Sequence, residues 1–248
     1  MKIIVLLIIG FVKKVARNLY WILNLIKTKK GTGSKLGFPI KIEGKGRLAF
    51  GKNCSVSKNT FFAIGNGCEI TLGNNCRIDE GVEIIAGKDA IITFGDNCWI
   101  MKNSIIRTKN EFLFANNVII ATNCAIFSRE GGYEGVLEVG YGTHIGDNTI
   151  IDVSDNLVIG AEVAIGPKCV IYTHDHDYSK SEKAAWKGGV ISKPVAIKQY
   201  AWIGSGVTLL PGIEIAERSV IGAGAVVTKK TESNSIYGGV PAKKIRSI

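Results

Sequence analysis

Several features typical of other protein classes are scarce or missing in this 248-residue chain. Proline occurs only five times and the thirty glycines follow no three-residue period, which excludes a collagen-like or proline-rich chain. With 46% apolar against 21% charged residues, wholesale disorder is excluded as well. The N-terminal apolar run, residues 3–12, is about half the ~20 residues that a membrane-spanning helix needs. The chain is therefore expected to fold around a core without crossing a bilayer.

Acidic residues are almost absent from the first part of the chain. Residues 1–52 contain twelve Lys or Arg and the single acid Glu43, whereas residues 53–248 contain nineteen basic and twenty acidic residues. The net charge of +10 is therefore an N-terminal feature. A basic segment beside an apolar one favours an anionic membrane surface over nucleic acid as a partner.

Residues 1–30 have the pattern of an amphipathic helix. Apolar residues recur at helical spacing from Ile3 to Ile26, and Lys13, Lys14 and Arg17 interrupt them from another side. Basic residues, not the small residues of a cleavage site, follow the apolar run, so we expect no signal peptide. The pattern predicts an interfacial membrane anchor with residues 20–21, Tyr-Trp, at headgroup depth. The alternative is a helix that packs on the body of the protein or on a partner subunit.

A repeat of six residues dominates the rest of the chain. An apolar residue recurs every six positions at Ile197, Ile203, Leu209, Ile215, Ile221 and Val227. A small or aliphatic residue follows most of these anchors by four, and the same unit recurs with interruptions back to Phe50. One inward anchor and one inward small residue per strand and turn is the pattern of a stacked parallel solenoid.

The six cysteines all fall in the small-residue slot of this repeat. Each follows an apolar anchor by four positions, and no close C-x-x-C pair indicates a metal cluster. We interpret them as buried, unpaired thiols in a reducing cytoplasm. They are Cys54, Cys68, Cys76, Cys98, Cys124 and Cys169.

The C-terminal half resembles the hexapeptide-repeat acyltransferases, and within them the sugar O-acetyltransferases of the maltose, galactoside, nodulation-factor and exopolysaccharide type. The resemblance rests on residues 139–246, in particular on Trp-Ile-Gly-Ser at 202–205, Ile-Gly-Ala-Gly at 221–224 and Gly-Gly-Val-Pro-Ala-Lys at 238–243. It implies an all-β solenoid, a left-handed parallel β-helix over residues 31–228. The N-terminal helix would precede it, and a tail at 229–248 would complete the donor site.

The repeat stops after Ile171 and resumes near Val195, and the enclosed segment contains the chain's only pair of neighbouring histidines. The resemblance implies a catalytic loop here, at 172–194, and a histidine that acts as general base. We predict His176 for this role, because in the resembled enzymes the base stands five positions after the last anchor. His174 and Asp177 are supporting candidates, as is Asp175 for orienting the ring.

The resemblance also implies acetyl-coenzyme A as co-substrate and assigns residues to the two substrates. No metal is expected. Donor contacts are expected at Ser205, Ala223, Thr228, Lys229, Lys243 and Arg246. Acceptor contacts are expected at Asp147, Asn148, Asp152 and Trp202.

The function predicted from the sequence is transfer of acetyl from acetyl-coenzyme A to a sugar hydroxyl. It would serve surface polysaccharide assembly by a homotrimer at the inner face of the membrane. An N-acetyltransferase acting on an amino sugar or an antibiotic would use the same histidine chemistry. A carbonic-anhydrase-type lyase would need three zinc-binding histidines, and the three present, His144, His174 and His176, have unsuitable spacing. A non-enzymatic structural solenoid is the remaining alternative.

Overall fold

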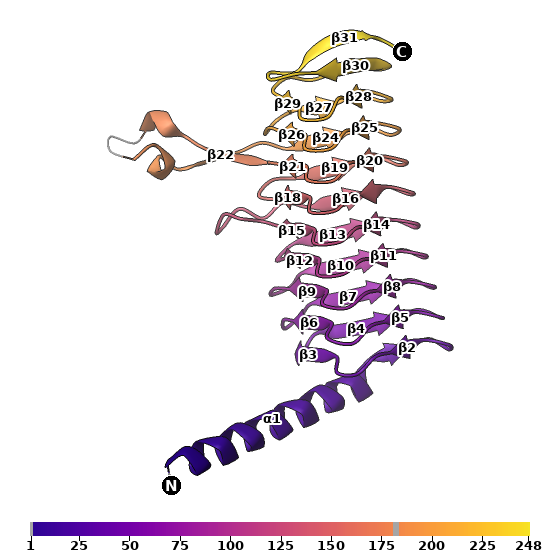
Figure 1. Cartoon of the computed structure of the whole chain (residues 1–248), viewed down its shortest axis with the longest axis vertical. Coiled ribbons are helices and arrows are strands. Elements are labelled where there is room, and N and C mark those ends of the chain that lie inside the picture. The colour runs from indigo at the N-terminus through magenta and orange to yellow at the C-terminus, as the bar shows by residue number, and fades with distance from the viewer. Residues whose placement is uncertain (1, 181–183) are drawn as a thin grey trace.

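The computed structural model describes residues 2–180 and 184–248. Met1 and residues 181–183, part of the expected catalytic loop, lie outside the described residues. One helix, α1 (Lys2–Lys27), precedes a column of short strands that wind into a three-sided solenoid (Figure 1). The helix ends three residues before the boundary expected at residue 30, and Lys29 already pairs with the second coil.

Each side of the solenoid is a sheet to which successive coils add one parallel strand, and only β31 (Lys243–Ser247) joins these sheets antiparallel among the described residues. The first sheet contains β1 (Lys29–Lys30), β4 (Arg47–Phe50), β7 (Glu69–Leu72), β10 (Ile91–Phe94), β13 (Glu111–Phe114), β16 (Leu137–Val139), β19 (Leu157–Ile159), β24 (Val195–Ile197) and β27 (Glu214–Ile215). The second contains β2 (Lys35–Leu36), β5 (Ser55–Val56), β8 (Arg77–Ile78), β11 (Trp99–Ile100), β14 (Ile119–Ile120), β17 (His144–Ile145), β20 (Ala164–Ile165), β25 (Trp202–Ile203), β28 (Val220–Ile221), β30 (Ser235–Gly238) and β31 (Lys243–Ser247). The third contains β3 (Lys41–Gly44), β6 (Phe61–Ile64), β9 (Glu83–Ala86), β12 (Ile105–Thr108), β15 (Ala125–Phe127), β18 (Ile150–Asp152), β21 (Val170–Ile171), β26 (Thr208–Leu209) and β29 (Val226–Val227).

The sequence repeat becomes the register of these sheets. Ile203 lies opposite Ile165 on one side and Ile221 on the other, so the apolar anchors of neighbouring coils stack inside the column. Strand residues alternate between buried and partly exposed, as a half-buried strand requires. The six cysteines are buried and unpaired in the predicted inward slot. The expected solenoid core is therefore confirmed.

The corners of the coils use residues that tolerate the left-handed conformation. Asn75, Asn97 and Asn117 have φ values of 57°, 58° and 61°, and Gly206 has 68°. L-residues other than asparagine and aspartate pay a steric cost at such angles, so the sequence places asparagine or glycine at many of these turns.

Both ends of the column are covered. At the start, Trp21 is buried against the solenoid, and the Asn24 side chain donates a hydrogen bond to the Ile42 carbonyl at 2.9 Å. At the far end, β31 runs antiparallel to β30 and closes the second sheet. Covering the ends protects strand edges that would otherwise pair with another chain. No helix among the described residues has the length and hydrophobicity needed to cross a bilayer.

Candidate active site

Two insertions leave the solenoid at the same corner and project to the same side (Figure 1). The shorter one, residues 128–136, connects β15 with β16. The longer one follows β21 and contains the antiparallel strands β22 (His174–His176) and β23 (Val190–Ser192), with short 3₁₀ turns η1 (Tyr178–Lys180) and η2 (Ala185–Lys187) between them. The end of β18 lies between β15 and β21 in the third sheet, so three successive coils contribute to one place.

His174 and Asp152 form a buried pair at this corner. The distance between His174 Nδ1 and Asp152 Oδ2 is 2.6 Å, and the two residues are 9% and 0% exposed. The Thr173 hydroxyl also donates to Asp152 Oδ2 at 3.1 Å, and the Ser154 hydroxyl donates to Oδ1 at 2.8 Å. The Arg129 N–H reaches Oδ1 from the shorter insertion at 3.1 Å. Asp152 is therefore fixed by donors on both oxygens.

These donors keep the Asp152 carboxylate ionised. Burial alone would raise the pKa of Asp152, but hydrogen bonds from His174, Ser154 and the Arg129 N–H outweigh it and hold the pKa below its usual value. An ionised carboxylate can only accept, so His174 Nδ1 carries the proton and donates it. In the neutral ring, Nε2 then has a free lone pair. This is the arrangement of a histidine that is prepared to take a proton from a substrate.

His176 lies on the same face of β22 as His174, because residues two apart in a strand point the same way. The two rings lie edge to face with centroids 5.8 Å apart. Nδ1 of His176 is buried and has no hydrogen-bond partner among the described residues. The structure thus places a carboxylate behind His174, whereas the count of five positions from Ile171 favours His176 as the base.

The aspartates that flank the histidines have other contacts. Asp175 Oδ1 accepts a hydrogen bond from the backbone N–H of His176 at 2.8 Å. The Asp177 carboxylate contacts Lys180 at 2.8 Å and accepts from the Ser179 hydroxyl at 2.5 Å. Hydrogen bonds from these two side chains lower the pKa of Asp177. Asp152, which we expected to contact the acceptor, is fully buried and bonded to His174 Nδ1.

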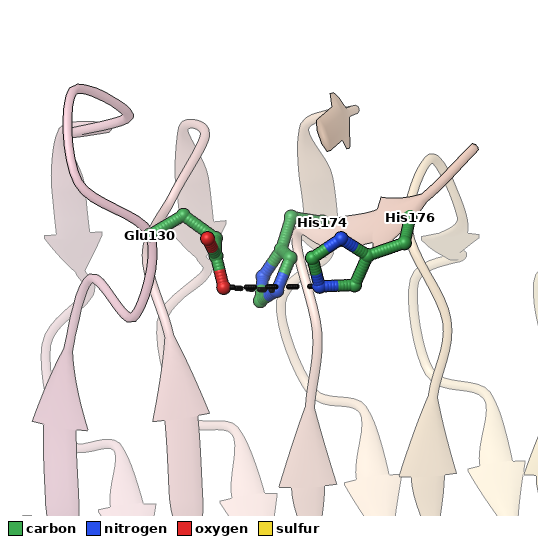
Figure 2. A group of neighbouring side chains, drawn as sticks. All are labelled: Glu130, His174 and His176. Carbon is green, nitrogen blue, oxygen red and sulfur yellow. Dashed lines mark ion pairs between the residues drawn. The ribbon is translucent and has the colours of Figure 1, made fainter. Parts of the chain in front are cut away.

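Glu130 was not anticipated from the sequence. Its Oε1 lies 3.6 Å from His174 Nε2 and 3.9 Å from His176 Nε2, so one carboxylate faces both rings (Figure 2). Neither distance is a hydrogen bond. The sequence nevertheless contained a sign of the insertion that holds Glu130. The stacked residues Phe112 and Leu137 are twenty-five positions apart, whereas Ile203 and Ile221 are eighteen apart, so the earlier coil contains extra residues.

A hollow of about 320 Å³ lies between the longer insertion and the edge of the column. His176, Asp177 and Tyr178 line it from the insertion, and Pro211 and Thr228 line it from the coils. Of the expected donor contacts, the structure therefore brings Thr228 beside the histidine segment. Lys229 follows Thr228 directly at the same corner.

The other expected donor contacts lie elsewhere in the chain. Ser205 and Ala223 occupy neighbouring coils at the corner between the second and third sheets, where the Gly224 N–H donates to the Ser205 carbonyl at 2.9 Å. Lys243 and Arg246 are exposed on β31. Ser205 and Ala223 lie just before the start of third-sheet strands, whereas the insertion with the histidines leaves from the end of such a strand.

The four expected acceptor contacts also lie in different parts of the solenoid. Asp147 and Asn148 lie in the turn between β17 and β18, at the same corner as Ser205, and Asp147 Oδ1 accepts from the Thr122 N–H at 2.9 Å. Trp202 is exposed on the second sheet. Within the single chain, Asp152 is the one of these four that reaches the histidines.

Residues 194–229 match the family model described as bacterial transferase hexapeptide (six repeats). Over this stretch the chain is similar to the hexapeptide-repeat proteins. It is 36% identical to the galactoside O-acetyltransferase of Lactococcus lactis over 132 residues, 52% of this chain and 62% of that protein. It is also 36% identical to the galactoside O-acetyltransferase of Escherichia coli over 116 residues, 44% of this chain and 56% of that protein. The chain thus spans less than two thirds of the length of these relatives.

A solved structure with the same architecture is that of an Arabidopsis UDP-N-acetylglucosamine acyltransferase. The match covers 89% of this chain and 70% of the Arabidopsis chain, with a TM-score of 0.56 and 16% sequence identity. This likeness concerns the fold alone. It confirms the expected left-handed parallel β-helix. The family match and the two galactoside O-acetyltransferase relatives confirm the resemblance to the hexapeptide-repeat acyltransferases.

Proposed function

We propose that this protein transfers the acetyl group of acetyl-coenzyme A to a sugar hydroxyl, with His174 as the general base. The observation that carries the proposal is the buried Asp152–His174 pair, in which Nδ1 of the ring faces the carboxylate and Nε2 faces the corner where both insertions meet. The galactoside O-acetyltransferases that this chain resembles indicate the class of donor and acceptor.

The reaction needs no nucleophile from the protein. His174 Nε2 takes the proton of the acceptor hydroxyl while its oxygen bonds to the thioester carbonyl carbon. The carbon–sulfur bond then breaks, and the leaving thiolate receives the proton from the imidazolium. Asp152 stays ionised throughout and stabilises the charge that develops on the ring. The products are an acetyl ester and coenzyme A.

The donor is proposed to approach along the corners of the last coils. Thr228 lines the hollow beside His176, and Lys229 adds a positive charge next to it. Ser205 and Ala223 would contact the pantetheine arm through the backbone. Lys243 and Arg246 would meet the phosphates, since ammonium and guanidinium groups both bind phosphate oxygens.

His176 remains the competing assignment for the base. Its position five residues after Ile171 favours it, but no carboxylate holds the proton on its Nδ1 in the described residues. A ring without an oriented tautomer is a poorer base than one held by an ionised partner. We therefore propose that His176 shapes the acceptor side of the site.

Incubation with labelled acetyl-coenzyme A and a panel of glycans tests the proposal. The panel should contain free, nucleotide-linked and lipid-linked sugars, together with amino sugars. We expect one class to gain an acetyl group in the mass spectrum, and mild alkali to remove it, as an ester requires. A label that resists alkali would indicate an amide and hence an N-acetyltransferase. No transfer to any sugar would contradict the proposal.

We also propose that α1 holds the enzyme on an anionic membrane surface, where lipid-linked glycans are acetylated. The last turns of the helix contact the solenoid through Trp21, Asn24 and the Tyr20 hydroxyl, which accepts from the Gly44 N–H at 3.3 Å. Of residues 20–21, expected at headgroup depth, Trp21 is buried against protein, whereas Tyr20 is 44% exposed. The large apolar side chains nearer the N-terminus are exposed: Leu6, Leu7, Ile8, Ile9, Phe11, Val12, Val15 and Leu19.

Basic side chains accompany this apolar surface. Lys13 and Lys14 are exposed on the helix, and a hollow of about 470 Å³ at its base is lined by Lys27, Lys29, Lys45 and Arg47. Such charges attract phosphate headgroups by about 1 kcal/mol for each basic residue near the surface. Apolar insertion and charge attraction together support an interfacial anchor.

Vesicle co-sedimentation tests this anchor. The full chain should bind vesicles that contain anionic phosphatidylglycerol, bind neutral phosphatidylcholine vesicles less, and be released by salt. Replacing Leu7 and Phe11 with serine should abolish binding, whereas replacing the exposed solenoid residue Tyr141 with serine should not. Binding that survives the helix substitutions would contradict the proposal and favour a partner subunit as the cover of α1.

A further inference from the structure

The three side chains Glu130, His174 and His176 converge on one point at the corner of the two insertions (Figure 2). Their facing atoms are Oε1 and the two Nε2 atoms, and all three lie within 4.8 Å of one another. The two histidines come from one strand, and the glutamate comes from a loop two coils earlier. We propose that this cluster is a binding site for a zinc-type divalent metal ion, which occupies His174 Nε2 in competition with the acceptor hydroxyl.

The separations suit such an ion. Zinc binds imidazole nitrogen and carboxylate oxygen at about 2.0–2.2 Å, which places tetrahedral ligands about 3.4 Å apart. The carboxylate lies 3.6 Å and 3.9 Å from the two ring nitrogens, so shifts of a few tenths of an ångström bring it to the ligand spacing with each of them. The ligand atoms of the two histidines lie within 4.8 Å of one another, and a rotation of one ring would bring them closer. Three protein ligands leave a fourth position open to water, as in zinc sites of the two-histidine, one-glutamate type.

The surroundings hold the ligands in place. His174 donates its Nδ1 proton to the fully buried Asp152, and a carboxylate behind a metal-binding histidine fixes the ring and strengthens it as a ligand. The Arg129 N–H bond to the same carboxylate ties the loop of Glu130 to this pair. The Ser128 and Ser154 hydroxyls, 3.4 Å apart, connect that loop to the neighbouring coil.

Charge and donor type indicate which ions fit. A divalent cation is balanced by Glu130 and Asp152, and both imidazoles bind as neutral ligands. Two nitrogens and one oxygen favour Zn²⁺, Co²⁺, Ni²⁺ or Cu²⁺ over Mg²⁺ and Ca²⁺, which prefer oxygen ligands throughout. Our expectation of no metal rested on the resemblance and on the spacing of cysteines and histidines, and it did not include a carboxylate from the second insertion.

The consequence for catalysis rests on the proposed function. Nε2 of His174 has one lone pair, and a bound metal ion uses the pair that would accept the proton of the sugar hydroxyl. Metal binding and base catalysis at His174 therefore exclude one another. The site would make acetyl transfer sensitive to the concentration of free zinc.

Metal binding can be measured without any assay of transfer. The full chain without a histidine tag is stripped by a chelator and titrated with Zn²⁺ by calorimetry and with Co²⁺ by visible absorption. We expect one ion per chain and the intense absorption bands of four-coordinate cobalt. Glu130→Gln and His176→Ala should each weaken binding by more than about 100-fold, and Asp152→Asn by about 10- to 100-fold.

Glu134→Gln is the matched control, because Glu134 lies in the same loop but contacts Lys109 at 2.6 Å. It should bind the metal as the unchanged chain does. Absence of binding by the unchanged chain, or equal binding by Glu130→Gln, would overturn the site. If transfer is observed, zinc should suppress it in the unchanged chain and a chelator should restore it. Binding without suppression would overturn the competition and leave the binding result intact.

Discussion

At the scale of single residues, the account depends on how Asp152 holds His174. Both oxygens of the Asp152 carboxylate accept hydrogen bonds, and the shortest of them joins Oδ2 to His174 Nδ1 at 2.6 Å. Because Asp152 is fully buried, it cannot contact an acceptor directly. Its proposed role is to position the ring and to fix the tautomer in which Nε2 is free.

Asp152→Asn should therefore impair turnover more than substrate binding. The amide can donate to His174 Nδ1 and favour the wrong tautomer, so kcat should fall by up to about 10²–10⁴ while KM for the donor changes little. The loss should not add to that of His174→Ala, because the two residues act as one unit. Kinetics of the single and double variants measure this.

Ser154→Ala is the control for Asp152→Asn. Ser154 also donates to Asp152 but does not touch the histidine, so its loss should lower kcat far less. A thermal melt of each variant shows whether the fold persists. Fully additive losses, or an Asp152→Asn effect confined to KM, would contradict the positioning role.

At this scale the sequence predicted the segment that contains the histidines, residues 172–194, but not which histidine is held by a carboxylate. The stop in the repeat located both histidines, and counting positions from Ile171 favoured His176. The choice between the two rings depends on a carboxylate twenty-two residues before His174, which the coil brings to within hydrogen-bond distance. Glu130 depends on a second insertion whose direction no local pattern reveals.

At the scale of elements, the turns of the coils require particular residue types, as the strands do. Asn117 has a φ of 61°, and its backbone N–H donates to the Asp96 carbonyl at 2.8 Å. The hexad anchors predicted the strands because each buries one side chain at a fixed interval. The left-handed asparagines were not predicted, because the apolar anchors set the period of the repeat without specifying the backbone angles of its turns.

Substitution of Asn117 should show this backbone requirement. Asn117→Ala puts a residue without the short polar side chain of asparagine into the left-handed region and should destabilise the protein by about 1 kcal/mol. Asn117→Gly meets no such cost and should be nearly neutral in comparison. Thermal unfolding of both variants tests this, and equal losses would show that the asparagine side chain, not the backbone, matters there.

At the scale of the whole molecule, the solenoid was the most predictable feature, because its period is written in consecutive residues. The placement of the substrate contacts was less predictable. Ser205, Ala223 and Asp147 lie at another corner from the histidines within one chain. A complete site that includes them would need a second copy with its matching corner placed against His174.

We therefore predict a homotrimer with sites between subunits, as cyclic packing of flat solenoid faces allows. Light scattering coupled to size exclusion should report three times the 26.7 kDa mass of one chain. The measurement should be made with and without residues 1–30, because removal of the helix should leave the trimer intact. A monomer with full transfer activity would contradict shared sites.

The central claim is that His174, held by Asp152, takes the proton from the sugar hydroxyl. The most direct measurement compares kcat for acetyl transfer in the unchanged chain, His174→Ala and His176→Ala, once the glycan panel has identified an acceptor. Loss of the base should lower kcat by about 10²–10⁴ in His174→Ala, with nearly unchanged affinity for coenzyme A, and the effect of His176→Ala should be much smaller. The reverse order, with His176→Ala the more damaging substitution, would contradict the account.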